Sequence, residues 1–114
     1  MVLLDVGLNE VADRLAPLVT EGIWGSGTTD PSPSDTGLET PIGSSNKTVT
    51  GTTSSNSMKF THELTSTDSN GETLTEYGLK FDDATFLNRN LSGAISKTAS
   101  FEVTTISTIN ILRG

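Results

Sequence analysis

Cysteine is absent from this 114-residue chain, and histidine occurs once, at His62. Without thiols the chain can form neither a disulfide framework nor a thiolate metal site. A single imidazole would leave a zinc site dependent on several carboxylates, which is not how such sites are usually built. We therefore expect no metal ion and no cofactor.

Basic residues are also scarce. Seven Lys and Arg face fourteen Asp and Glu, which gives a net charge of −7. Lys and Arg dominate binding to phosphate backbones and anionic lipid surfaces, so this balance argues against a nucleic-acid partner. No apolar run is long enough to cross a bilayer, and the first residues lack the basic and apolar parts of a signal peptide. We expect synthesis in the cytoplasm and no membrane insertion.

Large apolar side chains are few, at 32% hydrophobic and 5% aromatic residues. Such a chain has little core with which to offset backbone ordering, at about 1–2 kcal/mol per residue. Apolar surface buried between subunits would supply the missing stabilisation. Thr, with nineteen residues, favours strands, and Ser, with fourteen, favours turns and caps. This composition predicts β structure with polar loops.

An amphipathic helix is predicted over residues 2–19. Its apolar residues recur at spacings of four and three and form one stripe: Leu4, Leu8, Val11, Leu15 and Leu18. Pro17 and Gly22 mark its end. The stripe would cover the chain's own sheet, or pack against symmetry mates at heptad spacing, and the two roles are compatible.

Residues 24–57 are predicted to form an extended region rich in Ser, Thr, Gly and Pro. Asp30-Pro31 and Pro33 block a helix there. Short strands are expected at Ile23-Trp24 and at Lys47–Thr53.

Antiparallel strands are predicted over residues 58–112. Within 58–64 every second residue is apolar or His62, which is typical of a strand with one buried face. Asp68-Ser69-Asn70-Gly71 predicts a hairpin turn leading into a strand over 73–81, because Asn-Gly tolerates positive φ angles.

Asp82-Asp83 then predicts a second turn, followed by Thr85–Leu87 and a long final strand over 100–112. Ile106 and Leu112 lie opposite the other apolar residues of that strand, so we expect it to be buried on both faces. The fold class predicted for residues 1–114 is mainly β (α+β), a single antiparallel β-sandwich-like domain with an N-terminal amphipathic helix.

No pattern of catalytic residues emerges. His62 sits in strand alternation with no neighbouring acid to set its tautomer, and there is no Gly-x-Ser-x-Gly elbow. Gly25-Ser26-Gly27 lacks the lysine of a phosphate loop. We expect the protein not to be an enzyme and name no catalytic residue.

Weaker motifs have simple explanations. Asp68-x-Asn70-Gly71 is a fragment of a calcium loop without its outer ligands, and Asp82-Asp83 is expected to be a solvated turn. Asn46-Lys47-Thr48 and Asn90-Leu91-Ser92 match the glycosylation sequon, which arises often by chance.

Two stretches together resemble a known family. The first runs from Trp24 through Gly25-Ser-Gly-Thr-Thr-Asp-Pro-Ser-Pro-Ser-Asp-Thr-Gly37 to Leu38-Glu39. The second begins with Thr75-Glu76-Tyr77-Gly78-Leu79 and continues through Phe86–Arg89 and Ile95–Thr98 to a Thr/Ile-rich strand. The order is similar to that in small virion proteins of tailed bacteriophages and archaeal tailed viruses, including the N-terminal domains of tail-collar and tail-fibre proteins.

This resemblance implies a structural protein of the virion, made in the host cytoplasm. It would be a homo-oligomer of the tail, collar or baseplate, or a fibre-attachment adaptor; alternatively it would be a capsid turret or decoration protein. A carbohydrate-binding module for host recognition is a further alternative, with Trp24 and Tyr77 as its aromatic candidates. The expected partners are other copies, other virion proteins and the host surface.

Self-association is expected from apolar surface that so small a chain does not need for itself. A ring is predicted, trimeric or pentameric by preference. The residues expected near its contacts are Leu8, Leu15, Ile106 and Leu112.

Overall fold

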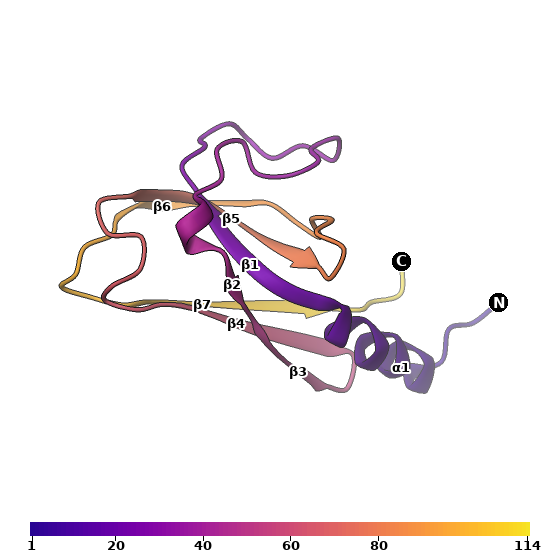
Figure 1. The fold of residues 1–114 in the computed structure, drawn as a ribbon. Helices are drawn as coiled ribbons and strands as arrows, with labels where there is room; N and C mark the ends of the chain where they lie inside the picture. The colour runs from indigo at the N-terminus through magenta and orange to yellow at the C-terminus, as the bar shows by residue number, and fades with distance from the viewer.

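Two antiparallel sheets stack face to face, and one α-helix packs at one end of the pair (Figure 1). This arrangement, seen in a computed structural model that describes residues 1–114, confirms the predicted β-sandwich-like fold with its N-terminal helix. The molecule is elongated, with extents of 51 × 28 × 25 Å. Both chain ends lie at the helix end of the long axis.

The first sheet has the strand order β2-β1-β5-β6 and the second has the order β3-β4-β7. The strands of the first sheet are β1 (Val19–Gly25), β2 (Lys47–Thr48), β5 (Thr73–Phe81) and β6 (Asn90–Ser96). Those of the second are β3 (Thr50–Ser54), β4 (Ser57–Leu64) and β7 (Val103–Asn110). Every pairing is antiparallel.

The helix is shorter than the predicted 2–19. Helix α1 spans Asp5–Leu15, because the chain is still extended at Leu4 and no side chain caps the first turn. At the other end Pro17 has no N–H to continue the ladder, and the chain tightens into a 3₁₀ turn, Ala16–Leu18.

The buried stripe of the helix also differs from the prediction. Leu8, Ala12 and Ala16 are buried on the sheets, whereas Leu4, Val11 and Leu18 are exposed. The small alanines let the helix approach the second sheet closely, so the larger residues at heptad spacing face outward.

The region predicted as an extended loop over 24–57 contains two complete strands, β2 and β3, and the end of β1. Ile23 and Trp24 belong to β1, a central seven-residue strand whose polar residues after Val19, Thr20-Glu21-Gly22, hide its strand character. The predicted strand 47–53 is divided between β2 and β3, which lie in different sheets. Residues 26–41 do form a loop without regular strands, with a short bridge between Gly25 and Pro41.

Strand β4 follows the prediction closely. Met58, Phe60, His62 and Leu64 are all fully buried, and the residues between them face outward. Strand β5 has the predicted bounds, 73–81.

The connection between β4 and β5 is not the predicted hairpin. The two strands lie in different sheets, so residues 65–72 carry the chain across the sandwich. The positive φ angles fall at Ser69 (53°) and Gly71 (87°), and Asn70 has none. Asn70-Gly71 therefore belongs to a wide connection between the two sheets, because the buried faces of β4 and β5 must both point into one core. The turn predicted at Asp82-Asp83 is present, with Ala84 at φ 70°.

Strand β5 is buried on both faces from Leu74 to Leu79. Its pairing with β6 shifts register between Leu74 and Glu76, which marks a bulge. The bulge lets Leu74 and Tyr77, three residues apart, both join the core, while Thr75 and Glu76 contact the 26–41 loop.

The final strand is shorter than predicted and is not buried on both faces. In β7 the residues alternate between half-buried and exposed, and Ile106 and Leu112 are 56% and 70% exposed. Nothing within the chain covers this outer face, because β7 lies in the outer layer of a two-layer sandwich.

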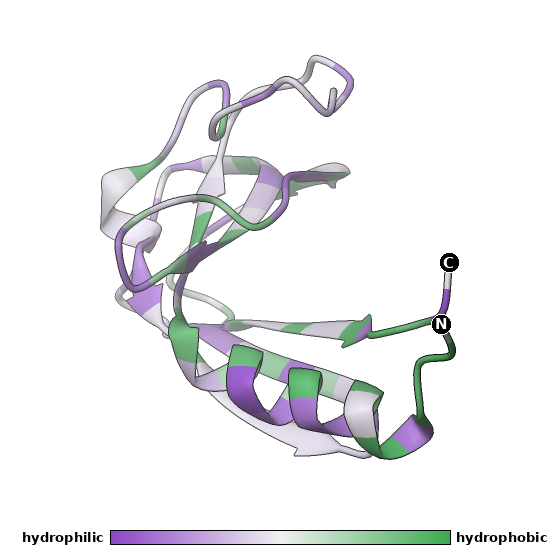
Figure 2. Cartoon of the chain, turned by 90° about the vertical axis from the view of Figure 1, so that its right-hand side faces the viewer, coloured by the Kyte–Doolittle hydropathy of each residue, from purple (hydrophilic) through white to green (hydrophobic).

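The core comprises twelve buried residues from both sheets, the helix and the adjoining turns, among them Ala12, Trp24, Phe60 and Leu79. Figure 2 shows that the helix carries apolar residues on more than its packed face. The chain contains no helix with the length and apolar character needed to traverse a bilayer.

Candidate functional site: an apolar tip, a buried clasp and an open edge

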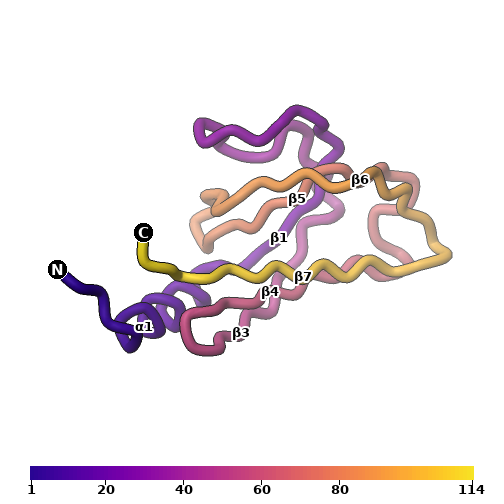
Figure 3. Tube along the Cα trace, turned by 180° about the vertical axis from the view of Figure 1, so that it is seen from behind, coloured from indigo at the N-terminus to yellow at the C-terminus, as the bar shows by residue number.

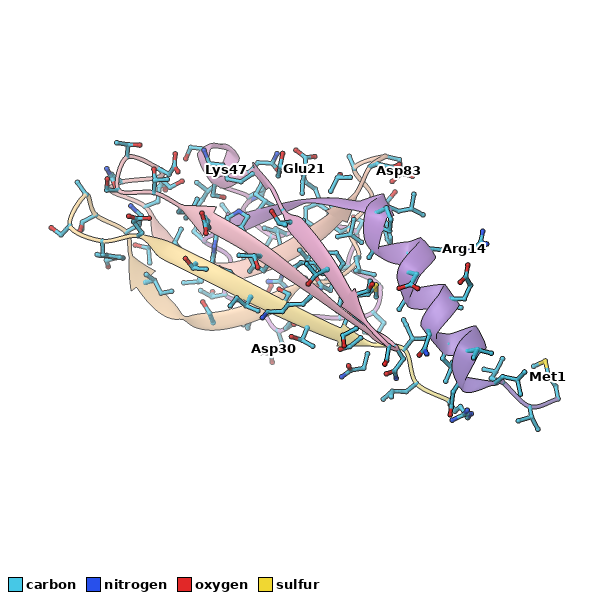
Figure 4. All side chains as sticks on the ribbon, turned by 90° about the horizontal axis from the view of Figure 1, so that it is seen from below. Met1, Arg14, Glu21, Asp30, Lys47 and Asp83 are labelled. Atoms are coloured by element: carbon cyan, nitrogen blue, oxygen red, sulfur yellow. The ribbon has the colours of Figure 1, made fainter.

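An exposed apolar surface occupies the end of the molecule where the two chain ends meet. We call it the apolar tip; its residues are Met1, Val2, Leu3, Leu4, Val6 and Leu112. Val2 and Val6 are 78% and 70% exposed. Figure 2 shows the apolar N-terminal segment beside the end of the chain, and in Figure 4 the Met1 side chain points away from the body.

Arg113 joins the two halves of the apolar tip. Its Nε donates to the Leu3 carbonyl at 2.9 Å, and its guanidinium pairs with Asp5. The segment before α1 is thus held next to the C-terminal residues while its side chains remain in solvent.

The four predicted interface residues fall into two groups. Leu8 is buried in the chain's own packing and offers no free surface, and Leu15 is half-buried against the core. Ile106 and Leu112 are exposed. The stripe did not identify the exposed side of α1, because both sides of the helix carry leucine or valine. The exposed Val6 lies off the stripe and was not among the predicted interface residues.

A buried carboxylate, Glu76, organises the 26–41 loop. Its oxygens accept backbone N–H bonds from Gly27 (2.7 Å), Glu39 (2.9 Å) and Thr40 (2.8 Å). Arg89 Nε adds an ion pair at 2.8 Å. Burial by itself would raise the pKa of Glu76, but Arg89 and the three N–H donors together hold that pKa below its usual value.

Arg89 extends this arrangement to the far side of the loop. Its other nitrogens contact Asp35 Oδ2 at 3.2 Å and the Thr29 carbonyl at 2.8 Å. We call Glu76, Arg89 and their loop contacts the clasp. Gly27 has to be glycine here, since a Cβ would lie 2.4 Å from Glu76 Oε2.

The residues that carry the family resemblance meet in the clasp. The Gly-Ser-Gly-Thr-Thr stretch, the Glu76-Tyr77-Gly78-Leu79 strand and Arg89 are far apart in sequence and in contact in the structure. Gly25-Ser26-Gly27, already set aside as a phosphate loop, has a structural role, because the Gly27 N–H binds the Glu76 carboxylate.

His62 lies between the sheets, fully buried, with Nε2 2.9 Å from the Ser45 carbonyl. Its Nδ1 has no hydrogen-bond partner, and its ring meets Tyr77 edge-on at 5.3 Å. Burial lowers the pKa of His62, and it raises that of Tyr77. No solvent reaches the imidazole, so it has no access to a substrate in this conformation.

The candidate cation ligands make local contacts instead. Asp68 accepts from the Thr65 N–H at 2.8 Å and from Lys47 at 3.0 Å, and these bonds lower its pKa to about 2. Asp83 accepts from the Thr85 N–H at 3.0 Å. No group of three or more His, Asp or Glu side chains is placed to hold a metal ion.

The two sequons differ in accessibility. Asn46 is half-buried, and its amide donates to Glu21 at 2.6 Å. Asn90 is exposed at the start of β6. Figure 4 shows Lys47, the residue after Asn46 in the sequon, near Glu21, since β2 pairs with β1 there.

The sandwich is open along the side where β6 and β7 form the free edges of their sheets. A cleft of about 360 Å³ lies between these strands, and we call it the edge cleft. Its floor includes Trp24 and Tyr77, and its walls are formed by Asn90–Ser92 and Thr105–Ile109.

Comparison with known proteins does not add a family to this picture. No protein-family model matches the chain, and no curated protein matches it in sequence.

Proposed function

We propose that the chain is a structural subunit of a tailed-virus particle, which assembles as a homo-oligomer in the tail, collar or baseplate or serves as a fibre-attachment adaptor. The apolar tip is the observation that carries this proposal. Six large apolar residues gather there in solvent, on a chain with only 32% hydrophobic residues. Contiguous apolar surface of this kind usually marks an interface.

The clasp supports the viral part of the proposal. The motifs that resemble tail-collar and tail-fibre N-terminal domains are the ones that fix the 26–41 loop on the sheet through Glu76 and Arg89. The hydrogen bonds and the ion pair between these motifs give a physical reason why they occur in this order along the chain.

A capsid turret or decoration protein would use the same apolar tip, and only its place in the particle would differ. A carbohydrate-binding module gains no support, because Trp24 and Tyr77 are 4% and 5% exposed and offer no sugar platform. A non-enzymatic role is proposed because His62 is sealed in the core without an acid or a nucleophile bonded to it.

Mass measurement of the full chain at micromolar concentration tests the assembly. We expect a closed oligomer that becomes a folded monomer when Val6→Asp and Leu112→Asp are combined. Thr67→Asp, an exposed polar residue in the 65–72 connection, is the matched control and should leave the oligomer intact. A well-folded wild-type monomer at these concentrations would contradict the proposal.

Electron-microscopic imaging of the virus particle with a labelled chain separates the two viral alternatives. Density for this fold at the tail, collar or baseplate supports the proposal. Density scattered over the capsid surface supports a turret or decoration protein, and absence from the particle refutes both.

A further inference from the structure

The edge cleft contains two polar atoms that lack hydrogen-bond partners. Trp24 Nε1 and Thr105 Oγ1 are both buried and unpaired, and both residues line the cleft. Since a buried polar group without a partner costs about 1–3 kcal/mol relative to a satisfied one, such groups are uncommon in folded proteins. An indole N–H can only donate, so an acceptor that reached Trp24 Nε1 would satisfy it.

The two strands that border the edge cleft are free edges with no protection against pairing. Neither β6 (Asn90–Ser96) nor β7 (Val103–Asn110) contains a charged residue or a proline. Natural edge strands are usually shielded by such residues, and an unshielded one readily accepts another strand. Figure 3 shows β7 running below the first sheet along this open side.

The edge cleft therefore offers three kinds of interaction to an added extended segment. The free edge of β7 or β6 offers backbone hydrogen bonds, Trp24 Nε1 offers a donor, and Leu91, Ile106 and Ile109 offer apolar contact. Strand addition of this type takes its affinity from main-chain bonds and its specificity from alternate side chains.

The segment Met1–Leu4 has the matching chemistry. It is apolar and exposed, it is extended at Leu4, and no side chain in it is charged. Because every copy carries a net charge of −7, surfaces that join two copies should be free of like charge. The residues lining the edge cleft are also all uncharged.

We propose that Met1–Leu4 of one copy gives up the bond between the Leu3 carbonyl and Arg113 and inserts into the edge cleft of a second copy as an added strand. This inference rests on the proposed self-association and names one of its contacts. The contact joins two different surfaces, so it is heterologous and forms a ring when the rotation between copies closes.

Disulfide trapping tests the contact directly, because the chain has no cysteine of its own. Val2→Cys is combined with Ser107→Cys on β7 or, separately, with Ser92→Cys on β6. We expect oxidised ladders of linked copies from at least one of these pairs on denaturing gels. Val2→Cys with Glu63→Cys, on the exposed side of β4, is the control and should give little linkage.

Trp24 supplies a second readout, since it is the single tryptophan and lines the edge cleft. Diluting the wild type through its dissociation range should shift the emission wavelength, and Val2→Asp should abolish the shift while the chain remains folded.

The outcomes separate this inference from the proposed function. If the wild type is oligomeric but neither cysteine pair links and Val2→Asp leaves the oligomer intact, the insertion is wrong and the assembly proposal stands. A wild type that is monomeric at all concentrations overturns both.

Discussion

Three buried polar side chains, Glu76, Lys97 and His62, are stabilised in different ways. Glu76 has an ion pair and three N–H donors. Lys97 has no carboxylate: its Nζ donates to Asn70 Oδ1 and the Thr98 carbonyl, both at 2.9 Å, and lies 5.6 Å from the Phe101 ring centre. His62 is held neutral by burial. Each ties separate segments together in a chain with few large apolar residues.

Removing Arg89 should leave the Glu76 carboxylate buried without its cation. Loss of one partner of a buried pair is strongly destabilising, because the remaining charge stays desolvated. Arg89→Met is therefore expected to lower the urea midpoint at least as far as a core truncation such as Leu8→Ala.

Arg14→Met is the matched control for Arg89→Met. Arg14 pairs with Glu10 on the exposed side of α1, where it projects into solvent (Figure 4). Exposed pairs contribute little, so its midpoint should match the wild type. Equal midpoints for both variants would show that the clasp does not stabilise the fold.

His62 should make stability fall in mildly acidic solution. Its pKa is lowered in the folded state, so below the ordinary value of about 6.5 the unfolded chain binds a proton that the folded chain resists. The stabilisation is complete above that pH and is lost as pH decreases. Urea unfolding between pH 7.5 and 5.5 measures this slope.

His62→Gln removes the titrating group and should flatten the slope over the same range, whatever its effect on absolute stability. Glu76 contributes at lower pH, because its lowered pKa stabilises the fold only above the ordinary carboxyl range. If His62→Gln leaves the pH dependence of stability unchanged, groups other than His62 cause that dependence.

At the scale of elements, the sequence predicted two strands closely, β4 with one buried face and β5 with two. The alternation in β4 and the bounds of β5 match the structure. Prediction failed where contacts between residues far apart in the sequence determine the structure. Asn70-Gly71 predicts a hairpin from local sequence, yet Asn70 has no positive φ and β4 and β5 belong to different sheets. Likewise β1 is polar from Thr20 to Gly22 and becomes a central strand only through pairing with β2 and β5.

The candidate site was predictable only in part, for the same reason. Periodicity identified the apolar residues of α1 but gave no information on which side the sheets would cover. The clasp depends on contacts across 13 to 60 positions of the sequence, such as Glu76 with Arg89 and Thr29 with Arg89. No local pattern encodes such pairs.

The buried side of α1 can be tested by truncation. Leu8 is 7% exposed, so Leu8→Ala should reduce the free energy of unfolding by about 2–3 kcal/mol. Leu4→Ala, an exposed residue of the same type, should change it by less than about 0.5 kcal/mol. Urea unfolding of both variants below the association range checks this, and a loss at Leu4→Ala as large as that at Leu8→Ala would restore the predicted stripe.

At the scale of the whole molecule, charge and apolar surface act in opposite directions on assembly. Each copy carries a net charge of −7, so approaching copies repel one another. The residues of the apolar tip and of the edge cleft have no charged side chains. The elongated shape places the tip at one extreme of a 51 Å axis. Long-range repulsion should then be the main electrostatic term.

Salt is therefore expected to strengthen the association. The screening length falls from about 30 Å at 0.01 M to about 8 Å at 0.15 M, which weakens repulsion between copies and leaves apolar contacts in place. Sedimentation at increasing NaCl should show a dissociation constant that decreases. Glu63→Lys with Glu102→Lys, both exposed and outside the tip, takes the charge from −7 to −3 and should produce much of the same tightening without salt. A dissociation constant that rises with salt would mean that ion pairs hold the copies together, and the uncharged surfaces would then not be the interface.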